Sequence, residues 1–328
     1  MTAARDEKQR RPVVAVVGPT AAGKSSLGVE LALRFGGEIV NCDSVQVYRE
    51  IEIATAKPTP EERRGVPHHL LDFVPPGVSY TAGAWAADAA RVIAGIESRG
   101  RLAILVGGTG FYLRALRRPL FQSHPTDEAL RARLTGLRGA RGPEHLHRIL
   151  RRLDSASAAR LNARDWPRVQ RALEVRLQTG RALSEQQAVR PEPLALVQRL
   201  RVFVLNPPRA DLYRRIDARA EAHFRAGLVE EVRRLLARGV PAGTQALGAH
   251  GYRRVVEHLR GERTLAGAVE QTKLDVRHYA KRQLTWFRRE PGVVWIDGFG
   301  DDPQVQLKVV RMVGESLHDG EARPAGGG

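Results

Sequence analysis

The sequence contains a single cysteine, Cys42, among its 328 residues. One thiol cannot form a disulfide within the chain or a zinc site built from several cysteines, so both are excluded. Long apolar runs are missing as well, because no segment approaches the roughly 18 uninterrupted apolar residues of a membrane-spanning helix. Residues 1–11 are polar and lack the apolar stretch of a secretory signal. We therefore expect a disordered tail there and a cytoplasmic protein.

Acidic residues are also fewer than basic residues. The chain has 36 Asp and Glu against 53 Lys and Arg, which gives a net charge of +17. A surplus of this size favours a polyanionic partner such as nucleic acid, or at least a ligand that carries phosphate groups. The alternative is an arginine-rich composition spread over solvated helix faces.

The pattern of the first 120 residues predicts an α/β fold. Short apolar runs alternate with helical segments, an order typical of right-handed βαβ units around a parallel sheet. The predicted strands are Pro12–Val17, Glu38–Asn41 and Leu102–Val106, and the predicted helices are Lys24–Arg34 and Trp85–Ser98. We expect helices to flank this sheet.

The pattern changes near Leu120. Residues 126–190 contain no strand-like run and are rich in arginine, whereas a strand pattern returns at Arg201–Leu205. The spacing of apolar residues predicts one long amphipathic helix over Asp211–Arg238. A further helix follows near 265–289, and a last strand at 293–296. We therefore predict a discontinuous α/β core with an all-helical insertion and a disordered C-terminal tail, bounded as follows: core 12–120 and 199–315, insertion 121–198, tail 316–328.

The strongest motif lies between the first predicted strand and helix. It reads Gly18-Pro19-Thr20-Ala21-Ala22-Gly23-Lys24-Ser25 and matches G-x4-G-K-[ST] in the required context. Such a loop turns backbone N–H groups towards an anion, and the helix N-terminus adds partial positive charge. Lys24 supplies a full charge, and the Ser25 hydroxyl can bind Mg²⁺. With the alternating strands and helices, the motif predicts a core with the architecture of a P-loop NTPase. It indicates a phosphate or diphosphate ligand without specifying the reaction, and an ordinary glycine-rich turn is the alternative.

Two further strand ends carry polar groups. Asp43 follows the second strand, where the carboxyl ends of an open α/β sheet face the ligand crevice. Its carboxylate can act as a general base, a metal ligand, a substrate anchor or a simple turn cap. The third strand runs into Gly107-Gly108-Thr109-Gly110 and lacks the aspartate that usually holds Mg²⁺ in P-loop NTPases. We expect these small residues to let a substrate approach the backbone, unless they form only a strand-to-helix turn.

Two other groups have competing interpretations. The pair His68-His69 could suggest a metal site, but neighbouring side chains on a strand point to opposite faces, so a structural or substrate-contact role is favoured. Arginines crowd the insertion, and a second basic segment near residue 280 contains Tyr279, Trp286 and Phe287. Arginine interleaved with aromatics suits RNA binding. For Trp286 and Phe287 themselves, core packing is the favoured role.

At these residues the sequence resembles the tRNA dimethylallyltransferases, also called tRNA isopentenyltransferases. Similar segments run through nearly the whole chain in order: GPTAAGKS (18–25), DSVQVYREIEIATAKPT (43–59), PHHLLD (67–72), LVGGTGFYLRAL (105–116), RVQRALEV (168–175), GLVEEVRRLLARG (227–239) and YAKRQLTWFR (279–288). The chain departs from the usual pattern at Asn41-Cys42, Ala54, Ser25, Asn162–Asp165 and Val276.

The resemblance implies transfer of a dimethylallyl group from dimethylallyl diphosphate to N6 of the adenosine adjacent to the anticodon in tRNA, with release of diphosphate. We expect Mg²⁺ as the cofactor, held at Ser25, residues 18–25 as the diphosphate site, Asp43 as the base that removes the N6 proton, and Thr20 as a donor to the departing oxygen. The Gln46 amide has the geometry to pair with an adenine edge. We expect a monomer whose tRNA contacts are Asp43, Ser44, Val45, Gln46, Thr109, Arg131, Arg164, Asp165, Arg168, Arg171, Arg277, Lys281 and Arg282.

Three rival functions make different predictions. A P-loop kinase of a small metabolite would consume ATP and show no salt-sensitive RNA binding. A non-catalytic RNA-binding ATPase would bind RNA with an affinity indifferent to dimethylallyl diphosphate. An enzyme that prenylates free adenine nucleotides would have no use for a large basic insertion.

Overall fold

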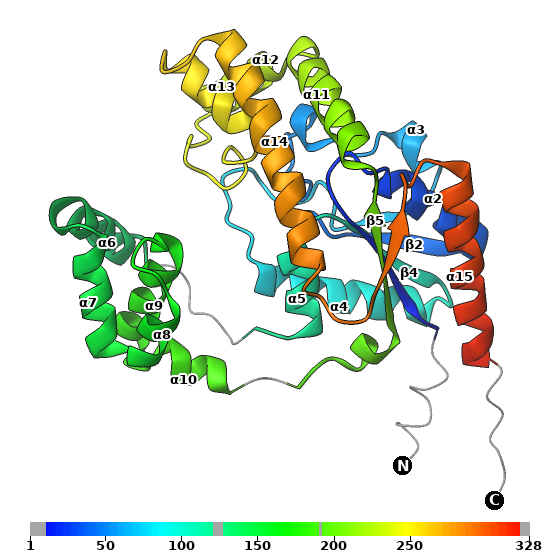
Figure 1. Cartoon of the computed structure of the whole chain (residues 1–328), viewed down its shortest axis with the longest axis horizontal. Helices are drawn as coiled ribbons and strands as arrows, with labels where there is room; N and C mark the ends of the chain where they lie inside the picture. The colour runs from blue at the N-terminus through cyan, green and yellow to red at the C-terminus, as the bar shows by residue number, and fades with distance from the viewer. Residues whose placement is uncertain (1–10, 121–126, 190–191, 322–328) are drawn as a thin grey trace, which may run out of the picture. The chain divides into compact units, whose positions relative to one another are not determined.

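The computed structural model of the chain describes residues 11–120, 127–189 and 192–321 (Figure 1). Most of the predicted N-terminal tail, 1–10, and the last residues, 322–328, lie outside this part. Contacts within the chain divide it into a first unit, which runs to Arg117 and resumes at Leu194, and a second unit, Arg118–Pro193. The predicted insertion, 121–198, begins three residues later than the second unit and ends five residues after it. The end differs because Leu196 is buried in the core of the first unit.

A six-stranded parallel sheet forms the centre of the first unit, which confirms the predicted α/β class. Its spatial order is β3-β2-β4-β1-β5-β6. The strands are β1 (Val13–Val17), β2 (Gly37–Asn41), β3 (His68–His69), β4 (Leu102–Gly107), β5 (Leu200–Asn206) and β6 (Val293–Asp297). The fifth strand follows the insertion in sequence but pairs with β1, opposing Val17 to Val204. The insertion therefore separates β5 from the earlier strands in sequence but does not disturb the pairing of the strands in the sheet.

Alternating side chains of the central strands enter two separate cores, as expected for a parallel sheet covered on both faces. Val14 and Val16 pack with Leu27, Leu31 and residues of the last helix, whereas Val13, Ala15 and Val17 face the other side. The elements around the sheet are η1 (Ile53–Thr55), η2 (Ala195–Arg199), α2 (Lys24–Phe35), α3 (Pro60–Arg63), α4 (Ala82–Ser98), α5 (Gly110–Arg117), α11 (Arg209–Arg225), α12 (Leu228–Ala237), α13 (Tyr252–Leu259), α14 (Leu265–Phe287) and α15 (Pro303–Glu321).

Three predictions about the first unit are corrected. The single helix expected over 211–238 is two helices, because Gly227 adopts a left-handed backbone with φ of 95° between α11 and α12. Residues 316–321 are helical rather than disordered, because α15 continues to Glu321. Val305, Val309 and Val313 anchor this helix by packing against the sheet. Arg11, assigned to the tail, donates to the Gly100 carbonyl at 3.2 Å.

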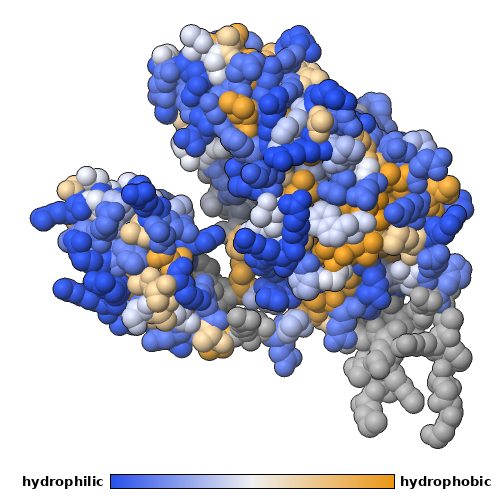
Figure 2. All heavy atoms as spheres, in the orientation of Figure 1, coloured by the Kyte–Doolittle hydropathy of each residue, from blue (hydrophilic) through white to orange (hydrophobic). Residues whose placement is uncertain are grey.

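The second unit is helical, with its own core. It contains α6 (Glu128–Arg141), α7 (Pro143–Leu153), α8 (Ser155–Arg160), α9 (Trp166–Thr179) and α10 (Leu183–Ala188). Leu146, Leu150 and Leu173 are buried together in it. Asp154 caps α8, and although burial opposes its ionisation, hydrogen bonds from Ser157 and Ser184 lower its pKa to about 2. The face of this unit seen in Figure 2 is mostly hydrophilic.

None of the described helices is long and apolar enough to cross a membrane.

Candidate functional site

The glycine-rich motif forms the connection from β1 to α2. Strand β1 ends at Val17, and α2 begins at Lys24, whose N-cap Gly23 has a φ of 79°. A side chain at Gly23 would also collide, because its Cβ would lie 2.7 Å from the backbone nitrogen of Asp301. The segment therefore has the strand–loop–helix context that a phosphate-binding loop requires.

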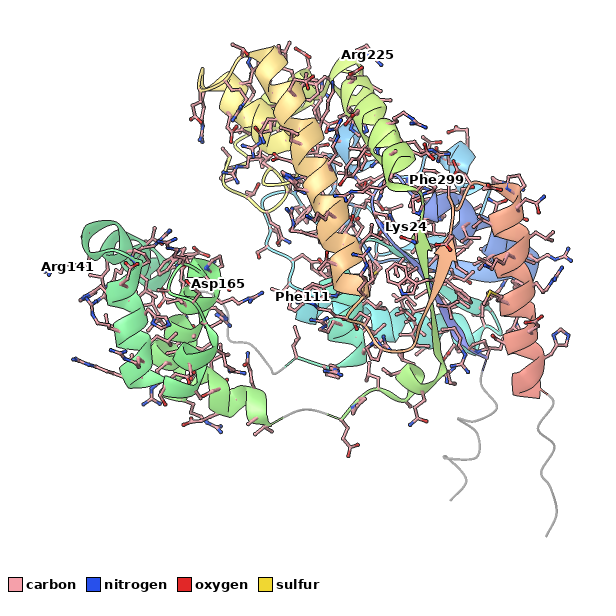
Figure 3. All side chains as sticks on the ribbon, in the orientation of Figure 1. Lys24, Phe111, Arg141, Asp165, Arg225 and Phe299 are labelled. Carbon is pink, nitrogen blue, oxygen red and sulfur yellow. The ribbon has the colours of Figure 1, made fainter. Side chains whose placement is uncertain are left out.

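Lys24 lies in this loop among opposing electrostatic influences (Figure 3). Its Nζ donates to the Pro19 carbonyl at 2.7 Å. Burial lowers its pKa to about 8, the carboxylate of Asp43 opposes that shift, and the guanidinium of Arg219 adds to it. A bound polyanion would stabilise the protonated form. Lys24 is therefore a cation whose charge depends on what occupies the loop.

A cavity of about 740 Å³, here called the loop cavity, opens over this motif. Its lining includes residues 20–26, Asp43, Gln46, Arg219 and Gln283. A smaller cavity of about 180 Å³, here called the inner cavity, is lined partly by residues of α11, α14 and the segment before α13. Five residues line both cavities: Thr20, Asp43, Thr55, Arg219 and Tyr279. A ligand in one cavity and a ligand in the other would therefore meet at these side chains.

Asp43 follows β2, and one of its oxygens has the capping role considered for it. Its Oδ1 accepts from the backbone nitrogens of Val45 at 2.9 Å and Gln46 at 3.4 Å, which caps the turn. Within the described part of the chain, no donor contacts its other oxygen. One oxygen therefore fixes the carboxylate in place, and the second remains available to a ligand at the junction of the two cavities.

Thr20 is oriented by two residues that the sequence alone did not single out. Its backbone nitrogen donates to Oε1 of Gln283 at 2.9 Å, and the Nε2 of the same amide donates to the Gly108 carbonyl at 2.9 Å. Arg219 donates to the Thr20 hydroxyl oxygen. Because that oxygen accepts from Arg219, its own hydrogen can be donated to a ligand.

The glycines of the Gly107–Gly110 turn pack closely against other parts of the protein. Gly107 also lines the loop cavity, so approach of a substrate to this backbone stays a prediction. An added Cβ would lie 2.1 Å from the Cys42 carbonyl oxygen at Gly107, 2.2 Å from Gln283 Nε2 at Gly108 and 2.2 Å from a ring carbon of Trp286 at Gly110. The glycines thus permit close internal packing, and the predicted core role of Trp286 is confirmed.

Thr109 and Gln46 hold the segment around Asp43. The Thr109 hydroxyl accepts from the Ser44 backbone nitrogen at 2.9 Å and lies 3.2 Å from the Ser44 hydroxyl. The Gln46 amide donates to the carbonyls of Thr55 at 3.1 Å and Ala56 at 3.0 Å. Its two N–H donors are therefore occupied, and only its oxygen is left to pair with an adenine edge. Ser44 and Val45 line the inner cavity.

The His68-His69 pair has a structural role, as predicted. Strand β3 pairs with β2, and the Nε2 of His69 lies 2.7 Å from the Glu38 carboxylate. The Nδ1 of His68 lies 2.8 Å from the Val66 carbonyl. No cluster of three or more His, Cys, Asp or Glu side chains suited to a metal occurs in residues 11–120, 127–189 and 192–321.

The predicted tRNA-binding arginines differ in their surroundings. In α14, Arg277 pairs with Asp217, with Nε 2.8 Å from the carboxylate, whereas Lys281 and Arg282 are exposed. In the second unit, Arg131 donates to the fully buried Glu174 at 2.9 Å, which Arg171 also reaches at 3.4 Å.

The Asn162–Asp165 turn presents its charges to solvent. Arg168 pairs with Asp165 at 3.1 Å, and its side chain is 72% exposed. Arg164 is exposed, with its backbone nitrogen bonded to the Asn162 side chain at 2.9 Å. Figure 3 labels Asp165 near the start of α9. Of the predicted set in this unit, Arg164 and Arg168 therefore project outwards, whereas Arg131 and Arg171 hold the helices together.

Comparisons with known proteins agree with one another. The family model described as IPP transferase matches residues 46–290. A tRNA dimethylallyltransferase of Solibacter usitatus is 50% identical over 93% of this chain and 99% of its own, and one of Thermomicrobium roseum is 44% identical over 98% of both.

Solved structures show the same likeness. The full-length tRNA isopentenylpyrophosphate transferase of Bacillus halodurans is 35% identical, with a TM-score of 0.70 over 95% of this chain and 98% of its own. A eukaryotic dimethylallyltransferase, solved in crystallographic snapshots of its action on tRNA, reaches a TM-score of 0.78 at 25% identity, over 97% of this chain and 81% of its own.

Proposed function

Because this chain belongs to the IPP transferase family and, like its relatives, transfers a dimethylallyl group to tRNA, we propose that the donor is dimethylallyl diphosphate, the acceptor is N6 of the adenosine adjacent to the anticodon, and the second product is diphosphate. The observation that carries this proposal is the position of Asp43, which lines both the loop cavity and the inner cavity. A donor in the first cavity and an adenine in the second would meet at its carboxylate.

The loop cavity suits the diphosphate end of the donor. The backbone of residues 18–25 supplies N–H groups at a helix N-terminus, and Lys24 and Arg219 add positive charge. Arg219 donates to the Thr20 hydroxyl oxygen and Lys24 to the Pro19 carbonyl, which supports a role for both cations at the oxygen that leaves the allylic carbon. Interactions of this kind strengthen as negative charge grows on the leaving group, and they can contribute several kcal/mol to catalysis.

Ser25 fits the proposed Mg²⁺ cofactor. Its hydroxyl lines the loop cavity at the start of α2, and Mg²⁺ commonly takes few protein oxygens when substrate phosphates supply the others. When bound there, the ion neutralises charge on the diphosphate.

Thr20 and Asp43 divide the chemistry between the two products. The allylic C–O bond breaks, and its electron pair leaves with the diphosphate, to which the Thr20 hydroxyl donates a hydrogen bond. The N6 lone pair forms the new C–N bond, and the proton lost from N6 passes to the free oxygen of Asp43. Adenine N6 is a weak nucleophile because its lone pair is delocalised, so a positioned base is needed and typically contributes about 10²–10⁴-fold.

The acceptor must leave its stack to reach the inner cavity. Flipping a loop nucleotide costs a few kcal/mol, which contacts elsewhere on the RNA offset. We propose that Ser44 and Val45, which line the inner cavity, receive the adenosine together with Gln46, which lines the adjoining loop cavity. Thr109 orients Ser44 through its hydroxyl group. Exposed cations of each unit bind the anticodon stem-loop. The protein acts as a monomer in the cytoplasm, where its tRNA substrate is found.

A single incubation tests this function. Purified protein is mixed with Mg²⁺, unmodified tRNA and radiolabelled dimethylallyl diphosphate, with a parallel reaction that contains ATP. Label at the adenosine adjacent to the anticodon is the expected result. Phosphate transfer or hydrolysis from ATP without label in tRNA would contradict the proposal and favour a kinase or ATPase.

A further inference from the structure

A third cavity, of about 200 Å³, lies beside the inner cavity. Here called the arginine cavity, it is lined by 248–250, Arg253, Arg254, Asp275, His278 and Arg282. The segment 248–250 also lines the inner cavity, so the two spaces are separated by little more than this stretch of chain. Gly248 and Ala249 bring almost no side-chain bulk to that boundary, so the two cavities lie close together.

The carboxylates near the arginine cavity are already neutralised. Asp275 accepts from Arg254 Nε at 2.6 Å and from Gln271 Nε2 at 3.0 Å. Glu257, on α13, accepts from Arg254 at 2.5 Å and from Arg263 at 3.1 Å. The two carboxylates are therefore already paired with arginines and offer little negative charge to a further cation at this cavity.

Arg282 carries the uncompensated charge at this place. Across the described residues no carboxylate lies within ion-pair distance of it, and its guanidinium lies 5.7 Å from the Tyr279 ring. Arg253 adds a largely exposed guanidinium, 3.4 Å from Glu257 at its nearest. Burial lowers the pKa of His250, and the charge of Arg282 lowers it further, so its ring is neutral at pH 7 and adds no competing charge.

A neutral aromatic surface joins the arginine cavity to Asp43. The His250 ring lies 4.8 Å from the Tyr279 ring, and both residues line the inner cavity with Asp43. A base beside Asp43 can stack against such rings, whereas its ribose continues past the small residues at 248–249. The next charged group of a polynucleotide would then enter the arginine cavity.

We propose that the arginine cavity binds the RNA backbone phosphate next to the acceptor adenosine, with Arg282 as its principal ligand and Arg253 as the second. This inference rests on the proposed function, because it takes the acceptor base to lie in the inner cavity. The diphosphate of the donor is a less suitable occupant, since the loop cavity provides Lys24, Arg219 and the backbone N–H groups for it. The arginine cavity would thus help to hold the flipped nucleotide by its phosphate.

The test uses a synthetic anticodon stem-loop and the full-length protein without donor. Arg282→Gln should weaken binding by about tenfold, the loss of one charge-assisted contact, and should reduce the salt slope of log K by about 0.7. The matched control is Arg311→Gln, which removes one charge from an exposed position of α15 that lines none of the three cavities. The control should bind within twofold of the unsubstituted protein, and Arg282→Lys should recover part of the affinity.

A second set of RNAs locates the contact. Neutral methylphosphonates replace, one at a time, the phosphates 5′ and 3′ of the acceptor adenosine and one in the distant stem. At one of the two flanking positions the replacement should lower the RNA affinity of the unsubstituted protein about tenfold. The RNA affinity of Arg282→Gln should hardly change. The proposal would be overturned if, at all three positions, the replacement weakened RNA binding by Arg282→Gln as much as binding by the unsubstituted protein. An increased KM of Arg282→Gln for dimethylallyl diphosphate, with unchanged RNA affinity, would overturn it as well.

The design separates this inference from the proposed function. Coupling between Arg282 and a flanking phosphate, together with no label at the adenosine in the transfer assay, would support the phosphate site and contradict the chemistry. Label at the adenosine without coupling would support the chemistry and overturn the phosphate site.

Discussion

The two units of the molecule use arginine and lysine in different ways. In the first unit, Lys24 and Arg219 are only partly exposed and point at the phosphate loop, each bonded to a group of that loop. In the second unit, Arg164 and Arg168 project into solvent, whereas Arg131 is committed to a buried glutamate. The first arrangement fixes a few charges at the phosphate loop. The second arrangement distributes positive charge over a surface, where each single residue matters little for the chemistry.

The sharpest test of this difference is Asp43→Asn. The amide oxygen can still accept from the Val45 nitrogen, so the turn is retained, but the side chain can no longer take the N6 proton. We expect kcat to fall by about 10²–10⁴, with little change in tRNA affinity, measured in single-turnover reactions at saturating substrates. Full turnover by this variant would exclude Asp43 as the base.

Lys24→Gln tests the other half of the same site. Loss of the charge should raise the KM for dimethylallyl diphosphate and lower kcat, because the ammonium group stabilises the diphosphate more as it departs. A combined loss of about 10² in kcat/KM is expected, measured at fixed tRNA. Lys308→Gln, at an exposed position of α15, is the matched control and should retain the parent values. Equal losses in both variants would indicate a general charge effect.

The pH dependence of donor binding follows from the same lysine. Burial lowers the pKa of Lys24 to about 8, so the free enzyme loses this charge as pH rises through that value. The KM for dimethylallyl diphosphate should therefore rise, by about tenfold for each pH unit above 8 if only the protonated form binds. In Lys24→Gln the rise should be absent. An unchanged profile in that variant would assign the titration to another group.

Local patterns in the sequence predicted the parts of this site that neighbouring residues build. The phosphate loop lies within one strand–turn–helix unit, and Asp43 follows a strand whose end the fold directs to the same edge. Arg219 and Gln283 escaped prediction because they reach Thr20 from 199 and 263 residues away. Gln283 offered one signal, a polar residue among the aromatics near the end of α14, but its bonding partners required the fold.

Contacts between residues that are distant in sequence also explain what the sequence analysis missed or predicted wrongly. The spacing of apolar residues predicts one helix through Gly227, because the amphipathic pattern is the same on both sides of the break between α11 and α12. The sequence also does not show that Cys42, Gln283 and Trp286 pack against the glycines of the turn after β4, where a side chain would collide with them. The charged insertion was recognised by its composition, yet composition could not separate Arg131, which serves packing, from Arg164.

Arg131→Gln sharpens the comparison inside the second unit. Glu174 is fully buried, and among the described residues loss of its ion pair with Arg131 leaves Arg171 as the remaining cation beside its carboxylate. We expect a loss of about 1–3 kcal/mol in the stability of this unit, measured by urea unfolding, and only a secondary effect on tRNA binding. A variant with unaltered stability and strongly reduced tRNA affinity would show that Arg131 binds RNA directly.

Arg164→Gln should have the smallest effect, because an exposed charge in high dielectric contributes little by itself. We expect the Kd for tRNA to rise about two- to threefold and the salt slope to fall by about 0.7–0.9, the share of one phosphate contact. The KM for dimethylallyl diphosphate reports on the loop cavity and should not follow this change. A loss in tRNA affinity of 100-fold would contradict the comparison itself, since it would mean that the second unit holds its RNA through a few fixed contacts, as the first unit holds its ligands.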